Sequence, residues 1–184
     1  MIPVHLWGWT NNAHTSTIRK QFEVLQHERR YKMPQICELP EQTLPLIVIN
    51  VTAQIMASRG KPNVQIIFLH PEFRMLALKT ITDGFQTIIR AATFHTKTFI
   101  IFCDATGSFP NNGHTPLTAA QINAALRRLA TQYPLNTLYL DLHQVVLTRD
   151  WTNSFNLRLP GQVKLGQAIV RALDGTPKEV FEYG

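Results

Sequence analysis

Short uninterrupted apolar runs alternate along the chain with longer segments in which apolar residues recur every three or four positions. Uninterrupted runs of this kind, rich in β-branched residues, are typical of strands that are buried on both faces of a sheet. The pattern predicts such strands at residues 4–7, 46–51, 97–103 and 138–142, and a further strand at residues 31–37.

Helical spacing of apolar residues predicts helices between these strands. Ile18, Phe22 and Leu25 share one face of a helix expected at residues 17–30. The other helices are expected at residues 73–92, at residues 118–133 behind an N-cap at Thr118, and from residue 160 or 161 to residue 173. Buried strands joined by short crossovers predict an α/β protein, a three-layer α/β/α sandwich with a parallel sheet.

Composition supports a folded protein of one domain. The chain has 184 residues, of which 45% are apolar and 16% are charged, and this balance excludes a disordered chain. We therefore expect a single domain over residues 1–184, in which residues 175–184 form a frayed tail. The net charge of +6 suits an acidic partner such as nucleic acid.

The cysteines and the hydropathy pattern indicate the compartment. Cys37 and Cys103 stand beside apolar residues and are expected to be buried thiols in a reducing environment. The start of the sequence shows no signal-peptide pattern, and the apolar runs are too short to span a bilayer. We therefore expect a cytoplasmic protein that does not bind a membrane.

Ligands of parallel sheets bind outside the carboxyl ends of the strands. The loops predicted there are residues 8–16, 52–62, 104–116 and 143–160. Titratable residues in or beside them are His14, Asp104, Asp141, His143 and Asp150. We interpret Asp141 as a turn cap and both histidines as partly exposed polar residues rather than catalytic bases. The sequence shows neither metal-ligand spacing nor a phosphate-binding glycine motif, so no metal or cofactor is expected.

The last loop and helix resemble the final sequence block of the SGNH (GDSL-type) hydrolases. In that block an Asp and a His, three residues apart, precede a Gly and a helix. The Gly falls at Gly161, but the catalytic pair falls at Asn153 and Asn156. An amide does not titrate near neutral pH, so neither Asn can act as a base or orient an imidazolium by its charge.

Two more blocks of that family are altered in this chain. The Gly-Asp-Ser block after the first strand corresponds to Gly8-Trp9-Thr10, and the Gly-x-Asn-Asp block to Val51-Thr52-Ala53-Gln54, where Gln54 is a substitute oxyanion donor. The resemblance implies an SGNH-hydrolase-like fold. The substitutions at Thr10, Gln54, Asn153 and Asn156 imply a degenerate hydrolase that is not an enzyme.

A second resemblance covers residues 39–79. It is carried by Leu39-Pro40-Glu41, Ile47-Val48-Ile49-Asn50, Ile55-Met56, Arg59-Gly60-Lys61-Pro62, Val64-Gln65-Ile66, His70 and Glu72-Phe73-Arg74, and further along by Leu140-Asp141-Leu142-His143. These segments resemble the core domain of the Oskar family, which organises insect germ plasm. The resemblance implies a non-catalytic domain that binds single-stranded regions of mRNA and meets protein partners in cytoplasmic ribonucleoprotein granules.

Phosphate contacts require Lys and Arg gathered on one surface. The residues expected to form such a basic rim around the crevice are Arg19, Lys20, Arg29, Arg30, Arg59, Lys61, Arg149 and Arg158. Trp9 and Trp151, in loops, are candidates for base stacking. Two alternatives stay open: an ester hydrolase that uses Thr10 with a displaced base, and a protein-interaction module.

Overall fold

A five-stranded parallel sheet forms the centre of the molecule. The computed structural model describes residues 1–8, 12–95, 97–110, 117–152 and 156–182. The strand order is β2-β1-β3-β4-β5, and every neighbouring pair is parallel. The strands are β1 (Val4–Trp7), β2 (Gln35–Cys37), β3 (Asn63–Phe68), β4 (Thr98–Asp104) and β5 (Thr137–Asp141). The predicted parallel sheet is confirmed.

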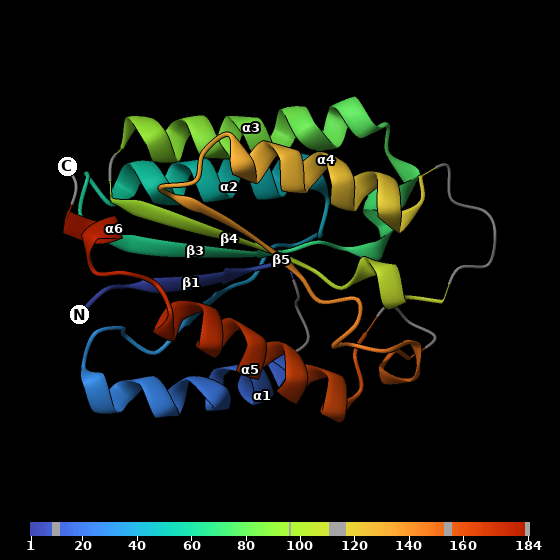
Figure 1. Cartoon of the computed structure of the whole chain (residues 1–184), viewed down its shortest axis with the longest axis horizontal. Helices are drawn as coiled ribbons and strands as arrows, with labels where there is room; N and C mark the ends of the chain where they lie inside the picture. The colour runs from blue at the N-terminus through green and yellow to red at the C-terminus, as the bar shows by residue number, and fades with distance from the viewer. Residues whose placement is uncertain (9–11, 96, 111–116, 153–155, 183–184) are drawn as a thin grey trace.

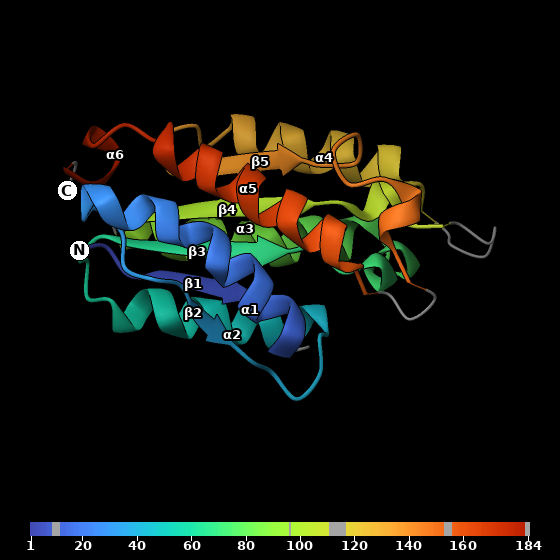
Figure 2. The same cartoon turned by 90° about the horizontal axis from the view of Figure 1, so that it is seen from below.

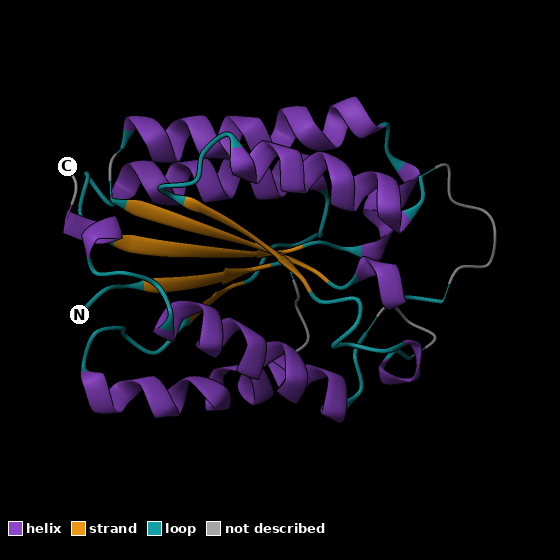
Figure 3. Ribbon diagram, viewed as in Figure 1, coloured by secondary structure: helices purple, strands orange, loops and turns teal. Residues whose placement is uncertain are grey.

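Helices cover both faces of this sheet, which gives the predicted three layers (Figures 1 and 3). One face carries α1 (Asn12–Gln21) and α5 (Leu159–Asp174), and the other carries α2 (Leu44–Ala57), α3 (Leu78–Phe94) and α4 (Ala119–Thr131). The shorter elements are the 3-10 helices η1 (Phe22–Glu28), η2 (Pro71–Met75), η3 (Thr106–Ser108) and η4 (Thr148–Asp150), and the short helix α6 (Glu179–Glu182).

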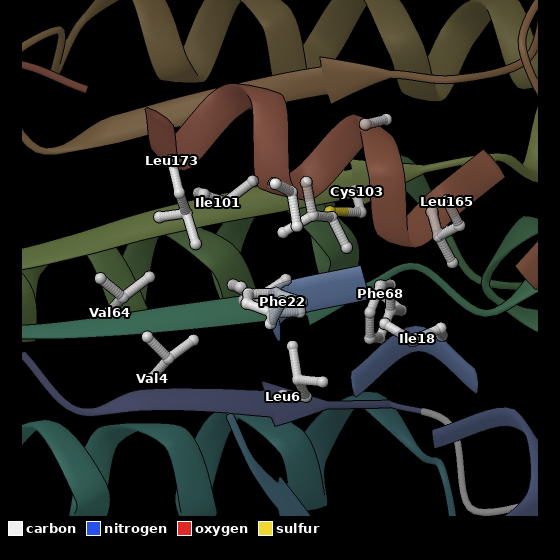
Figure 4. Packing of buried hydrophobic residues seen from close by; sticks show 14 of the residues in the cluster. Val4, Leu6, Ile18, Phe22, Val64, Phe68, Ile101, Cys103, Leu165 and Leu173 are labelled. Atoms are coloured by element: carbon white, nitrogen blue, oxygen red, sulfur yellow. The ribbon is translucent and has the colours of Figure 1, made fainter. Parts of the chain in front are cut away.

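The two faces of the sheet have separate hydrophobic cores. Alternate residues of a strand point to opposite faces, so Leu6 and Ile66 pack towards α1 and α5, while Ile67 and Phe102 pack towards α2, α3 and α4. Figure 4 shows the first core, where Phe22 of η1 meets the strands and α5. Strands buried on both faces explain the uninterrupted apolar runs of the sequence.

One predicted strand is wrong. Residues 46–51 belong to α2, and the strand that was not predicted is β3. Leu44, Ile47, Val51 and Ile55 are the buried residues of α2 and recur at helical spacing. Pro45 lies in the first turn, where its fixed φ suits a helix. The β-branched run therefore misled the prediction, because packing against the sheet overrides intrinsic propensity.

The segment expected to be a frayed tail is folded as far as Glu182. It forms α6, and Phe181 is buried against the rings of Tyr31 and Phe99, with centroids 6.2 Å away in each pair. Arg30 donates a hydrogen bond to the carbonyl of Thr176 at 2.7 Å. These contacts tie the end of the described chain to the amino ends of the strands.

Candidate functional site

The carboxyl ends of β4 and β5 border a cavity that α4 closes from the side. Asp104 and Asp141, the last residues of the two strands, are register partners. The cavity has a volume of about 560 Å³ and is lined by Asp104, Gly107, Ala119, Ala120, Asn123, Ala124, Arg127, Asp141 and His143. It occupies the position where parallel sheets bind ligands, and it gathers titratable and polar groups.

Asp141 and His143 form a hydrogen-bonded acid–base pair in this cavity. His143 Nδ1 contacts Asp141 Oδ1, and the backbone N–H of His143 donates to the same oxygen at 3.3 Å. A carboxylate only accepts hydrogen bonds, so Nδ1 carries a proton, which leaves Nε2 as the nitrogen that can exchange a proton with a ligand. The His143 side chain is 40% exposed and that of Asp141 is 18% exposed, so the ring can meet a ligand while its carboxylate stays sheltered.

Two side chains of α4 hold the other oxygen of Asp141. Asn123 Nδ2 donates to Oδ2 at 2.6 Å and Arg127 Nη2 donates at 3.0 Å. Partial burial alone would raise the pKa of Asp141, but hydrogen bonds from Asn123 and His143 outweigh it and lower that pKa. The carboxylate is therefore charged at neutral pH, and both of its oxygens are fixed in direction.

Asp104 has a structural role beside this pair. Its Oδ1 accepts from the backbone N–H of Thr106 at 2.9 Å and from the Thr106 hydroxyl at 2.6 Å, and its Oδ2 accepts from the Tyr139 hydroxyl at 2.5 Å. Burial and then the nearby Asp104 charge raise the pKa of Tyr139, which keeps this hydroxyl a donor. Asp104 thus fastens the end of β4 to β5 and to η3.

Gly107 allows the ring of His143 to lie where it does. A Cβ at position 107 would be 2.7 Å from the Cβ of His143, closer than such atoms approach one another. The absent side chain of Gly107 therefore determines the position of the pair against η3.

A larger cavity lies at the opposite ends of the strands, where β4 and β5 begin. It has a volume of about 770 Å³, and its walls come from the amino ends of β4 and β5, from the end of α3, and from the segment between the end of α5 and the start of α6. Its lining is mostly apolar, and its charged residues are Lys97 and Glu179. This cavity has no acid–base pair, so we place the candidate site at the carboxyl edge.

The structure describes two of the four positions taken from the SGNH sequence blocks, Gln54 and Asn156. Thr10 and Asn153 lie outside the described residues. Asn156 is half-buried in the segment before α5, and its carbonyl accepts from the backbone N–H of Thr152 at 2.7 Å. Gln54 lies within α2, so its assignment to an oxyanion block is wrong. The segment that follows β3 is instead Leu69-His70-Pro71-Glu72.

The expected basic rim is not one surface. Arg149 lies in η4 and Arg158 at the start of α5, on the carboxyl side. Arg59 and Lys61 follow α2 and precede β3, so they lie at the amino edge, where Arg30 also lies beside Ile2. Arg19 and Lys20 are exposed in the last turn of α1, and Arg29 follows η1. The premise that Arg59 and Lys61 border the crevice is wrong, because the segment before them is a helix rather than a strand.

Of the two residues proposed to stack on bases, the structure describes Trp151 and not Trp9. Trp151 is buried, its ring N–H donates to the Ser108 hydroxyl at 2.9 Å, and its ring packs edge-on against Phe109. Such a ring is unavailable for stacking on a base. Trp9 lies outside the described residues.

Comparison with known proteins gives a match in structure but none in sequence. No family model matches the chain, and no curated protein does. A solved structure, "Crystal Structure of TesA", superimposes with a TM-score of 0.71 over 98% of this chain and 99% of that one, at 11% sequence identity. The chain shares the α/β fold of that structure, which is SGNH-hydrolase-like. The SGNH-like sandwich predicted from the last sequence block is thereby confirmed.

Two predictions are corrected by the same match. The resemblance to Oskar is wrong, because the chain matches the structure of TesA and no sequence comparison supports Oskar. The prediction that the chain is not an enzyme is also contradicted, because the chain shares its fold with TesA. The likeness itself concerns the fold.

In the part of the chain that the structure describes, no helix combines the length and hydropathy needed to cross a bilayer. Within the same residues, His, Cys, Asp and Glu side chains do not gather in threes that could hold a metal ion.

The sequence contained a signal for the pair of Asp141 and His143, although it was interpreted as a turn cap and a partly exposed polar residue. Asp141 and His143 are two residues apart, directly after a buried apolar run. Asp141 ends β5, and the backbone turn that follows brings the ring back onto its carboxylate. The contribution of Asn123 and Arg127 from α4 depends on tertiary packing, which no spacing in the sequence reveals.

Proposed function

We propose that the chain is an ester or thioester hydrolase in which His143, oriented by Asp141, is the general base. The observation that supports this is the hydrogen-bonded pair in the cavity at the carboxyl edge, whose carboxylate is fixed on both oxygens. A base oriented by a third group is the arrangement that activates a nucleophile in hydrolases. The SGNH-type fold of TesA is consistent with this reaction class.

The nucleophile of this proposal is a water molecule. Nε2 of His143 takes a proton from water as the oxygen attacks the ester carbonyl, and the imidazolium that forms is stabilised by Asp141. When the tetrahedral intermediate collapses, the bond to the leaving oxygen or sulfur breaks and Nε2 returns its proton to that atom. One acid and one alcohol or thiol result, and the histidine is regenerated.

The described end of β1 is distant from this base. β1 ends at Trp7 and His143 follows β5, and β3 and β4 lie between these two strands. Three strand spacings of about 4.8 Å each separate the ends of β1 and β5 by roughly 14 Å. Thr10 itself lies outside the described residues, and mutation separates the two hydrolase hypotheses, one with His143 as base and one with Thr10 as nucleophile.

Hydrolysis of a nitrophenyl ester and of a short acyl thioester tests the proposal. We expect His143→Ala to lower kcat/KM about 10²–10⁴-fold, since a general base contributes that much, and Asp141→Asn to lower it at least about tenfold. Gln144→Ala, at the exposed neighbouring position, is the matched control and should retain activity. Full activity in His143→Ala, or loss only in Thr10→Val, would overturn the assignment of the base.

RNA binding is a second candidate function, and the observation that favours it is the position of several basic residues. Arg59, Lys61 and Lys97 all precede strands at the amino edge, and Asn63 N–H donates to the carbonyl of Lys97 at 3.1 Å, which joins the two segments. Anisotropy of labelled single-stranded RNA over a salt series tests this. Salt-sensitive binding that Arg59→Glu weakens more than Arg158→Glu would support it. Granule localisation is not proposed, since it was implied by the Oskar resemblance alone.

A further inference from the structure

Helix α2 differs from the other helices on its side of the sheet, because it contains no charged residue. Its sequence is LPLIVINVTAQIMA. The neighbouring α3 presents Lys79, Asp83 and Arg90 to solvent, and α4 presents Arg127 and Arg128. A helix without charged residues is normally covered by other elements over most of its surface. Within this chain, α2 packs on α3 and the sheet, and Figure 2 shows it at the border of the molecule on the β2 side.

The uncovered face of α2 is a straight apolar stripe. Its members, which we call the α2 stripe, are Pro45, Ile49, Ala53 and Met56. They recur at spacings of three or four residues and are all exposed, with Ile49 at 65% and Met56 at 54%. Ala53 is small enough for another helix to approach the stripe closely. Single exposed apolar residues are ordinary, but a stripe along a whole helix is typical of an interface.

Charges of opposite sign lie at the two ends of α2. Glu41 is exposed just before the helix, and Arg59 and Lys61 are exposed just after it. Within the described chain neither Glu41 nor Lys61 forms an ion pair. The backbone of this second end is well defined, since Lys61 N–H donates to the carbonyl of Ser58 at 3.0 Å and Arg59 has a φ of 52°.

We propose that the α2 stripe binds a second copy of this chain, with the two α2 helices antiparallel about a two-fold axis. A two-fold interface needs a patch that complements itself. An antiparallel pair centred on the stripe brings Ile49 against the partner's Ala53. It also sets Glu41 beside the partner's Lys61, and the same contacts occur twice. A parallel arrangement would place like charges together at both ends, which is unfavourable.

The interface is small, so the dimer is weak. A helix of 14 residues is about 21 Å long. A contact limited to one helix from each copy lies at the low end of specific interfaces, and we expect a dissociation constant on the order of 10–100 µM. The active-site proposal does not depend on this dimer.

Sedimentation velocity over a concentration series from about 5 to 500 µM tests the proposal. Ile49→Glu should raise the dissociation constant at least tenfold, because it puts two carboxylates into the apolar contact. Thr87→Glu, at an exposed position of α3, is the matched control and should leave the constant unchanged. Circular dichroism verifies that both variants are folded. A monomer throughout the series, or a dimer unaffected by Ile49→Glu, would overturn the proposal.

Charge reversal tests the antiparallel arrangement with residues outside the helix. Glu41→Lys and Lys61→Glu should each weaken the dimer severalfold, because each opposes like charges twice across the axis. The double variant should recover most of the affinity of the original chain, since both pairs are restored in reverse. Additive weakening in the double variant would exclude the antiparallel pairing.

Discussion

At the scale of single residues, Gly107 determines whether the acid–base pair exists in its present geometry. We expect Gly107→Ala to displace the ring of His143, because the new Cβ would lie 2.7 Å from the Cβ of that residue. Overpacking of this kind costs about 1–3 kcal/mol. Hydrolytic activity should fall at least about tenfold, since general-base catalysis depends on geometry.

The matched control for this change is Gly175→Ala. A Cβ there has nothing closer than the Arg171 carbonyl at 3.4 Å, and the backbone is right-handed, so both activity and stability should be retained. Chemical-shift perturbation of the His143 ring resonances would report the displacement directly. An unmoved ring in the Gly107 variant would contradict the role of this glycine.

Asp141 makes stability depend on pH in a defined direction. A lowered pKa means that the folded state holds the carboxylate more strongly than the unfolded state does. The stabilisation is complete above the ordinary Asp pKa of about 4 and is lost as the pH falls through the lower pKa of the folded state. Asp141→Asn should therefore lower the free energy of unfolding by about 1–3 kcal/mol at pH 7.

Urea unfolding at neutral pH and at about pH 2.5 measures this linkage. The difference between the original chain and the Asn variant should shrink as the pH falls through the lowered pKa of the folded state, because protonation removes the charge that the hydrogen bonds stabilise. A difference that stays constant would assign the loss to packing rather than to the charge.

At the scale of elements, α4 begins with the N-cap that the sequence predicts. Thr118 Oγ1 accepts from the N–H of Gln121 at 3.2 Å, and Gln121 Oε1 accepts from the N–H of Thr118 at 2.8 Å, which forms a capping box. Because α4 carries Asn123 and Arg127, the cap also anchors the helix that fixes Asp141. Thr118→Ala should cost about 1 kcal/mol.

Thermal unfolding of Thr118→Ala beside Thr131→Ala tests the cap. Thr131 is exposed at the last turn of α4, and its hydroxyl only contacts carbonyls of its own helix. Its removal should change stability by less than about 0.5 kcal/mol. Equal losses in the two variants would show that the capping box has no special contribution.

Helices with a clear helical spacing of apolar residues were predictable. Segments whose composition suits both a strand and a helix were not. The stripe of Ile122, Leu126 and Leu129 defines α4 in the sequence as in the structure. Residues 46–51 have the β-branched composition of a strand, yet the buried positions of α2 continue to Ile55 at helical spacing. The apolar run of β3 was interrupted in the sequence because Asn63 and Gln65 are polar, although both are buried and hydrogen-bonded to each other at 2.9 Å.

At the scale of the whole molecule, α6 joins the two ends of the described chain. Phe181 packs on Tyr31 and Phe99, and the guanidinium of Arg30 lies 5.7 Å from its ring centroid. Phe181→Ala should lower the free energy of unfolding by about 2–4 kcal/mol, because it leaves a cavity between the strands and η1. The exposed Phe94, at 82%, is the control, and Phe94→Ala should be nearly neutral.

The candidate site was only partly predictable, for a reason that also belongs to the whole molecule. Asp141 and His143 are close in the sequence. The hydrogen bonds that orient Asp141 come from Asn123 and Arg127, and the space for His143 comes from Gly107, on elements far apart along the chain. Only the order of the strands brings these segments together. Resemblance to the SGNH blocks drew attention to Asn153 and Asn156 instead, although it indicated the correct fold.

The packing of α1 against α5 has a consequence for synthesis on the ribosome. The apolar face of α1 and η1, with Ile18 and Phe22, is covered by Leu165, Ile169 and other residues of α5. Since the chain emerges from its amino end, this face stays uncovered until α5 has been translated. The nascent protein is therefore expected to need a chaperone until α5 has been translated, and fragments that stop before α5 should aggregate more readily than a chain that includes α5.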